Sequence, residues 1–200
     1  MNKVSKHYDL LIDNDNDPVL DSKELSEYMD KWDGEAFISL LNLDGRETVL
    51  EIGCGTGRIA KRIISRCKKY VGVDISAKTV CAAKKHFVNA DNAFFVNEDF
   101  LDYRTNEKYD VIYSTLTFMH IEEKEKALMH VFNLLKPKGR FVLSIDKNQQ
   151  NFIDTGYSKI VIFPDSPIEI CKTLTSLRFV AIKTKEIDNA YIITAQRSEV

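Results

Sequence analysis

Short apolar runs alternate with segments of helical periodicity over most of the chain. From residue 47 onward, the apolar runs predict strands at 47–52, 70–74, 93–97, 109–114 and 140–145. Between these runs, apolar residues at helical spacing predict helices at 58–67, 77–87 and 122–135. Repeated strand–helix–strand units require a parallel sheet with helices on both faces, so the fold class is predicted to be α/β.

The N-terminal part of the chain lacks this alternation. Residues 1–20 are polar and are interpreted as a solvated, mobile arm, whereas 21–32 and 34–43 carry the apolar spacing of two helices. We therefore expect one domain over residues 1–200. Its first part, 1–45, would be an arm and lid helices, and 46–200 would be the α/β core.

The C-terminal part predicts a different set of elements. Residues 159–163 form a short predicted strand, and Ser166 and Pro167 open a helix that runs to about residue 177. The stretches 180–187 and 190–196 then alternate apolar and polar residues around a central turn. A terminal antiparallel hairpin is the expected result.

Composition and charge restrict the class of protein. Apolar residues make up 44%, charged residues 29%, and the net charge is −2, so no global field attracts nucleic acid or anionic lipid. No apolar run approaches the ~20 residues of a membrane span, and the N-terminus lacks the apolar core of a signal peptide. Four scattered cysteines indicate reduced thiols. We expect a cytoplasmic protein with no membrane partner.

The stretch VLEIGCGTGRIA at residues 49–60 carries the most specific signal. It predicts a strand, a tight turn and a helix N-terminus, in which glycines allow a ligand to approach main-chain N–H groups. Such a turn is typical of sites for nucleotides or adenosine-like ligands. The dinucleotide fingerprint needs glycine at position 58, which is Arg58, so a nicotinamide-dependent oxidoreductase is disfavoured.

The residues Glu51, Gly53, Gly55 and Gly57 form a pattern that resembles motif I of class I S-adenosylmethionine-dependent methyltransferases. The resemblance extends from residue 47 to about residue 145. It implies a Rossmann-like three-layer sandwich whose seven-stranded, mostly parallel sheet has the order 3-2-1-4-5-7-6 and ends in an antiparallel hairpin. It also implies S-adenosylmethionine as cofactor and S-adenosylhomocysteine as product.

Candidate cofactor residues follow the predicted strands, because ligands of open α/β sheets bind beyond the carboxyl ends of the strands. Asp74 follows Gly53 by about 20 residues, the distance at which an acid binds ribose hydroxyls; the alternatives are a solvated loop acid or a helix N-cap. Ile75 would face the adenine. The resemblance assigns Asp99 to the adenine amino group and Phe100 to the base, with Glu98 as the competitor.

Other residues are assigned to the methionine end of the cofactor. Glu51 would lie beside the amino group, because a buried charge needs a partner. By the resemblance, the segment from Ser114 to residue 121 lies over the sulfonium and faces the methyl acceptor. Tyr28 and Trp32 are either core residues or cofactor contacts of a lid helix. Cys54 belongs to the glycine turn and completes the cofactor set.

The acceptor is less well defined by the sequence. His120 is either a general base, as the near-neutral pKa of an ordinary histidine permits, or a structural residue. His7, His86 and His130 are interpreted as surface residues. The segment after residue 114 contains no proline, which argues against adenine and glutamine-amide acceptors, and no Pro-Cys occurs for cytosine-C5 chemistry. No metal site is predicted, since Asp146 has no convincing partner.

The sequence therefore predicts an enzyme that methylates a small-molecule acceptor by in-line displacement. Most of the basic residues in the stretch Arg58, Lys61, Arg62, Arg66, Lys68 and Lys69 are interpreted as the solvent face of a helix, so a nucleic-acid partner is disfavoured. Residues 147–159 would contribute a lid, with Phe152 and Tyr157 as candidates. The alternatives are methylation of a protein or RNA group and a catalytically silent cofactor-binding module. Oligomeric state and acceptor stay unassigned.

Overall fold

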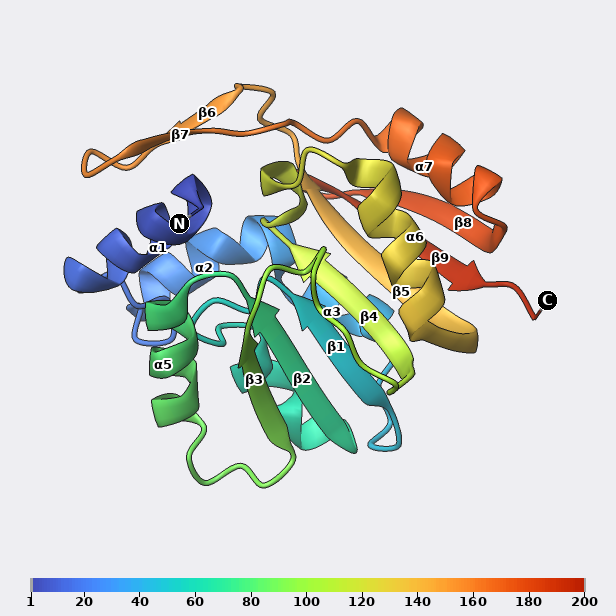
Figure 1. Ribbon diagram of the computed structural model, residues 1–200, viewed down its shortest axis with the longest axis horizontal. Helices are drawn as coiled ribbons and strands as arrows, with labels where there is room; N and C mark the ends of the chain where they lie inside the picture. Colours follow the sequence, from blue (N-terminus) through green and yellow to red (C-terminus); the bar gives the residue numbers. More distant parts are fainter. Residues whose placement is uncertain (1, 200) are drawn as a thin grey trace.

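A seven-stranded sheet forms the centre of the molecule in the computed structural model, which describes residues 2–199 (Figure 1). Its strand order is β3-β2-β1-β4-β5-β9-β8. The first five strands of the chain pair in parallel, and β8 and β9 close the sheet as an antiparallel hairpin. The α/β fold and the predicted strand order are therefore confirmed. The strands are β1 Thr48–Ile52, β2 Lys69–Asp74, β3 Ala93–Asn97, β4 Tyr109–Thr115, β5 Leu135–Asp146, β8 Phe179–Glu186 and β9 Ala190–Arg197.

Apolar side chains on both sides of the sheet pack against helices. One side packs against α6 (Lys124–Leu134) and α7 (Pro167–Ser176), the other against α3 (Glu35–Leu41), α4 (Ala60–Ile63) and α5 (Ala77–His86). Successive β-strand residues point to opposite faces, so Leu50 and Ile52 belong to the first core and Val49 to the second. Glu51 consequently points toward the side of the sheet that α3, α4 and α5 cover.

The helix after the glycine turn is shorter than the predicted 58–67. It comprises α4 and a 3-10 turn, η1 (Ile64–Arg66). The Asn92 side chain donates to the carbonyls of Ile64 and Cys67 at 2.9 and 3.1 Å. These bonds satisfy carbonyls at the helix end, which lets the chain leave the helix early.

The interpretation of residues 1–20 as a mobile arm is wrong. Residues Lys3–Asp13 form α1, whose N-terminus is capped by Asn2. The Asp9 carboxylate accepts hydrogen bonds from Ser76 Oγ (2.7 Å) and the Lys78 backbone N–H (3.0 Å), so α1 is fixed to the start of α5. The helical spacing of Val4, Tyr8, Leu11 and Ile12 is the sequence signal that could have identified this helix.

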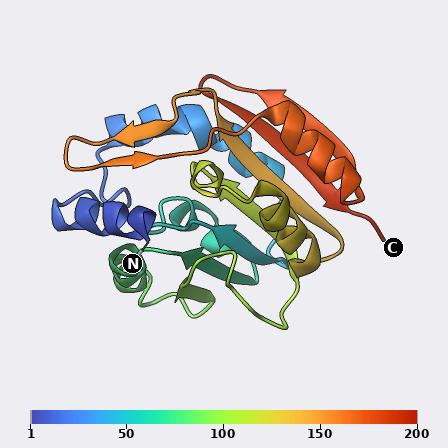
Figure 2. The same cartoon turned by 45° about the horizontal axis from the view of Figure 1, so that its top comes forward.

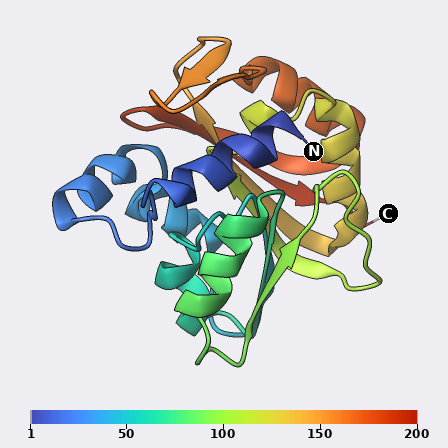
Figure 3. The same cartoon turned by 60° about the vertical axis from the view of Figure 1, so that its left-hand side comes forward.

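The predicted strand at 159–163 is present as β7 (Lys159–Val161), which pairs with β6 (Phe152–Asp154) outside the main sheet. This hairpin extends toward α1 in Figure 2. His7 of α1 forms a hydrogen bond with the Ser158 hydroxyl and is almost fully buried, so its interpretation as a surface residue is wrong. Helix α1 lies between α5 and the hairpin (Figure 3).

The second predicted helix is α2 (Lys23–Asp33), capped by Ser22. The carbonyl of Trp32 accepts a hydrogen bond from Ser144 Oγ of β5 at 2.7 Å, which fixes the end of α2 beside the sheet. None of the helices in residues 2–199 combines the length and the apolar character that a membrane crossing requires.

Candidate functional site

A cavity of about 950 Å³ opens at the carboxyl ends of the parallel strands. Its walls come from the glycine turn after β1 and from residues that follow β2, β3 and β4. Residues of α1, α2 and β7 line the opposite side. Segments that precede and follow the strands β1–β5 therefore enclose the edge of the sheet at which α/β proteins bind ligands.

The glycine turn fits a ligand that contacts main-chain atoms. Gly53 and Gly55 both have positive φ, at 75° and 53°, which favours glycine. A Cβ at Gly53 would collide with the Thr117 side chain, whereas a Cβ at Gly55 would have no atom within 4 Å. Backbone at Gly55 is therefore open to the cavity, as close approach of a ligand requires.

Asp74 is the last residue of β2 and is hydrogen-bonded to this turn. Its carboxylate accepts from the backbone N–H groups of Gly55 and Ser76, each at 2.8 Å, and from Thr79 Oγ1 at 3.2 Å. Ser76 is the N-cap of α5, so the N-cap alternative for Asp74 is wrong. Burial raises the pKa of Asp74 even though these donors lower it.

Glu51 is buried at the end of β1 and lines the same cavity. Tyr70 Oη and Tyr113 Oη both donate to its Oε2, the second at 2.8 Å. Among the described residues no donor contacts Oε1. Burial raises the pKa of Glu51 to about 8, against the effect of the two phenols. The charge of Arg58 also lowers this pKa, but less than burial raises it, and no cation of the described residues forms a hydrogen bond with the carboxyl group.

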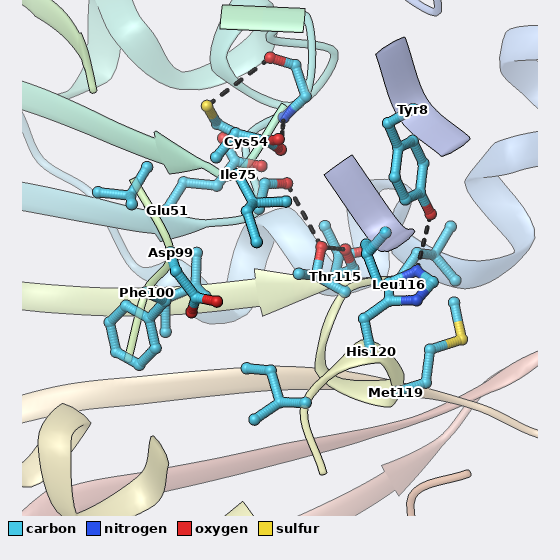
Figure 4. A pocket seen from close by; sticks show the side chains of 18 of the residues that line it. Tyr8, Glu51, Cys54, Ile75, Asp99, Phe100, Thr115, Leu116, Met119 and His120 are labelled. Atoms are coloured by element: carbon cyan, nitrogen blue, oxygen red, sulfur yellow. Dashed lines mark hydrogen bonds between the residues drawn. The ribbon is translucent and has the colours of Figure 1, made fainter. Parts of the chain in front are cut away.

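The residues after β3 line the cavity as expected from their position. Asp99 and Phe100 lie beside each other, and Ile75 faces them from the end of β2 (Figure 4). The ring of Phe100 also packs against His130 at a centroid distance of 4.9 Å. Glu98 lines the cavity too, so the alternative register stays open.

His120 lies in the 3-10 turn η2 (Phe118–His120) and lines the cavity. Its Nε2 is 2.7 Å from the hydroxyl of Tyr8, a residue of α1 that the sequence analysis missed. Burial lowers the pKa of His120 to about 4, with smaller effects from His7 and Lys124. His120 is thus neutral at physiological pH.

Three of the predicted cofactor residues lie outside the cavity lining. Ser114 is buried and donates to the Ile52 carbonyl at 3.0 Å. Gly57 faces the Phe87 ring, with which a Cβ would collide. Tyr28 is half exposed and packs edge-on against Trp32, and only Trp32 of this pair lines the cavity. Cys54 lines it as well, and burial raises the pKa of its thiol.

Arg58 does not share the solvent-facing surface that was expected for most of the basic residues in its stretch. Its guanidinium donates to both carboxylate oxygens of Asp33, with Nη1 at 2.8 Å, and Thr115 Oγ1 donates to the same carboxylate. Asp33 is fully buried, and Arg58 lines the cavity. A bidentate pair of this kind joins the end of α2 to the glycine turn.

The predicted lid contributes different residues from those expected. Neither Phe152 nor Tyr157 lines the cavity, and the Tyr157 side chain is exposed. Lys159, Ile160 and Phe163 line it instead. Within residues 2–199, no group of three or more metal-ligating side chains is close enough to hold a metal ion.

This chain resembles known methyltransferases in sequence. A family model described as a methyltransferase domain matches residues 43–186. Two malonyl-[acyl-carrier protein] O-methyltransferases of Ilyobacter polytropus are 34% identical over 52% of this chain and 30% identical over 76% of it. The matches cover 40% and 57% of these relatives, so the chain spans about half the length of the curated relatives it matches.

Solved structures share the fold. A complex of DhpI with SAH has a TM-score of 0.75 at 18% identity and covers 96% of this chain and 94% of its own. An S-adenosylmethionine-dependent methyltransferase from Mesorhizobium loti has a TM-score of 0.69 at 15% identity, with coverages of 82% and 97%.

Proposed function

The chain belongs to the methyltransferase domain family, and we propose that it transfers the methyl group of S-adenosylmethionine to a small-molecule acceptor. The observation that carries this proposal is the backbone of Gly55, which is open to the cavity. Its N–H group donates a hydrogen bond to Asp74, and the buried Glu51 lines the same cavity. The names of the Ilyobacter relatives support an acceptor that is small or presented on a carrier.

The residues around the glycine turn match the chemical groups of this cofactor. Asp74 accepts from the ribose hydroxyls, and Glu51 Oε1 accepts from the amino group. Asp99, Phe100 and Ile75 surround the adenine. When bound, S-adenosylmethionine supplies a methyl group on a sulfonium, which is a good leaving group.

The protein contributes position and exclusion of water. The glycine turn and the strand ends hold one side of the cavity, while α1, α2 and β7 cover the other. Alignment of two reactants in a closed site supplies much of the rate of such a displacement, so a strong base is not essential.

The shape of the cavity favours an enzyme over a silent cofactor-binding module. Beyond the glycine turn, the cavity continues to a largely apolar wall at Met29, Met119, Ile160 and Phe163. Its volume of about 950 Å³ is at the upper end of the range for small-molecule sites. A cofactor and a small acceptor therefore fit together.

Titration calorimetry with S-adenosylmethionine and S-adenosylhomocysteine, with NAD as control, tests the cofactor assignment. We expect both sulfur compounds to bind and NAD not to bind. Binding of NAD alone would overturn the proposal. Transfer of labelled methyl groups in a fractionated lysate then separates acceptor classes, since a labelled macromolecule would indicate a protein or RNA acceptor.

A further inference from the structure

Tyr8 and His120 meet across the cavity although 112 residues separate them in the sequence. Tyr8 comes from α1 and His120 from η2, and both line the cavity. The hydroxyl of Tyr8 points at the imidazole ring, 2.7 Å from Nε2 (Figure 4). The two rings meet edge to face, with centroids 5.4 Å apart. This contact joins the covering helix to the segment that follows β4.

The surroundings of His120 indicate which nitrogen carries the proton. A neutral imidazole has one donor nitrogen and one acceptor nitrogen. Nδ1 of His120 is buried and has no hydrogen-bond partner among the described residues. Buried N–H groups without a partner are rarer than buried acceptors without one. The proton therefore belongs on Nε2, which donates to the Tyr8 oxygen.

This tautomer leaves the hydroxyl hydrogen of Tyr8 free. Burial raises the pKa of Tyr8, so the phenol stays protonated. With its oxygen occupied by the imidazole N–H, Tyr8 directs a donor toward the remaining space of the cavity. The pair thus provides a hydrogen-bond donor and no general base. This suits a methyl acceptor whose reacting atom is already ionised and needs no deprotonation.

Two lysines on the same side of the cavity are the cations available to an anionic acceptor, and one of them, Lys159, has its ammonium 3.7 Å from the centroid of the Phe152 ring. Lys3 of α1 and Lys159 of β7 line the cavity, and neither has a carboxylate within 4.0 Å in residues 2–199. Of the acids on this wall, Glu123 pairs with Lys126 at 3.0 Å. Asp146 accepts from the Asn148 backbone N–H at 2.9 Å, whereas Glu122 has no comparable partner within the described part of the chain.

We propose that the methyl acceptor is a carboxylate with an apolar body, and that the Tyr8 hydroxyl holds one of its oxygens. This inference rests on the proposed methyl transfer. The second carboxylate oxygen forms a bond to the methyl carbon, while the carbon–sulfur bond breaks and its electron pair stays on sulfur. The product is a methyl ester, and no proton is gained or lost. Met119 and Ile160 contact the apolar body.

Straight-chain carboxylates from butanoate to dodecanoate are suitable probes, each compared with the alcohol and the amine of equal length. Calorimetry is done on the protein loaded with S-adenosylhomocysteine. We expect one or more carboxylates to bind more tightly than their matched alcohol and amine, and to yield a methyl ester with S-adenosylmethionine. Tyr8→Phe should weaken the binding of that carboxylate by about 10-fold or more. Tyr191→Phe, on β9 outside the cavity, should not.

Nitrogen-15 NMR of histidine provides a test that needs neither cofactor nor turnover. We expect His120 to carry its proton on Nε2, with Nδ1 bare, and Tyr8→Phe to shift the Nε2 resonance. A proton on Nδ1 would make Tyr8 the donor to His120 and would overturn the inference.

Binding of S-adenosylhomocysteine separates the two proposals, because only the methyltransferase proposal depends on it alone. If S-adenosylhomocysteine does not bind, the methyltransferase proposal is lost and the carboxylate inference with it. If S-adenosylhomocysteine binds but amines or alcohols are preferred to every carboxylate, only the carboxylate inference is lost. An equal loss of carboxylate affinity in Tyr8→Phe and Tyr191→Phe would remove Tyr8 from the site.

Discussion

At the scale of single residues, the protonation of Glu51 depends on burial more than on hydrogen bonding. Two phenols donate to its carboxyl group, yet the absence of solvent raises its pKa to about 8. The pKa of an acid falls when a cation comes close. A ligand with an ammonium group would therefore both bind to Glu51 and change its charge.

We expect proton release when S-adenosylhomocysteine binds at pH 7. With a pKa of about 8, Glu51 is mostly protonated in the free protein, and a nearby ammonium would displace close to one proton. Calorimetry in buffers of different ionisation enthalpy measures this number. The release should disappear in Glu51→Gln, and an unchanged release in that variant would contradict the assignment.

The same pKa gives a prediction for stability. Since the pKa of Glu51 in the folded protein lies above the ordinary glutamate value of 4.5, the folded protein binds the proton more strongly than the unfolded chain does. The contribution of Glu51 is therefore largest below about pH 4.5 and is lost as the pH rises to about 8. Urea unfolding should show Glu51→Gln gaining stability relative to wild type from pH 5 to pH 8. A constant difference would argue against the raised pKa.

Asp74 gives the sharpest prediction for affinity. If its carboxylate binds both ribose hydroxyls, Asp74→Ala should weaken S-adenosylhomocysteine binding by about 10- to 150-fold. Because Asp74 also holds the Gly55 N–H, Thr79→Val serves as a control that removes another bond to the same carboxylate. Affinity unchanged in Asp74→Ala would exclude Asp74 from the site.

At the scale of elements, the glycine turn combines two constraints. Its backbone needs positive φ, and at Gly53 the Thr117 side chain occupies the space of a Cβ. Either constraint alone is tolerable, because a strained residue costs on the order of 1–3 kcal/mol. Together they couple the end of β1 to the segment after β4.

Gly53→Ala should therefore lower the free energy of unfolding more than Gly156→Ala does. Gly156 has a φ of 80° but no atom within 4 Å of a Cβ, so it isolates the backbone strain. We expect an additional loss of about 1–3 kcal/mol at Gly53 from the steric collision. Chemical denaturation measures both, and equal losses would show that Thr117 moves away freely.

At the scale of the whole molecule, the cavity is enclosed by segments distant in sequence. Helix α1 is attached to α5 through Asp9 and to the β6–β7 hairpin through His7. Because residues of the sheet edge, α1 and β7 all line the cavity, a bound ligand is expected to contact several of these segments. Ligand binding should therefore stabilise the fold as a unit.

S-adenosylhomocysteine at 100 times its Kd should stabilise the protein by about 2.7 kcal/mol. For a domain of this size, the melting temperature should rise by roughly 5–11 °C. Scanning fluorimetry measures the shift, and Asp74→Ala at the same ligand concentration should show a much smaller one. An equal shift in both would point to binding elsewhere.

From residue 47 onward, the pattern of the sequence was enough to predict the alternation of strands and helices and the position of the glycine turn, and the strand order was implied by the resemblance to class I methyltransferases; helix α1 and strand β6 were missed. The alternation and the turn are local features: strand and helix periodicity, and glycine at positive φ, can be recognised within short windows. The sequence also placed Glu51, Asp74 and Asp99 at or just beyond the ends of strands, and parallel strands end at one edge of the sheet.

Which distant side chains meet, and in what ionisation state, could be seen only in the folded molecule. The contact of Tyr8 with His120, the pair of Arg58 with Asp33 and the burial of His7 join segments that no local pattern relates. Likewise, Ser114 and Gly57 satisfied the sequence pattern but face the protein interior. The physical reason is that burial and partner geometry, which set pKa values and hydrogen bonds, arise from packing between segments and not from their own sequence.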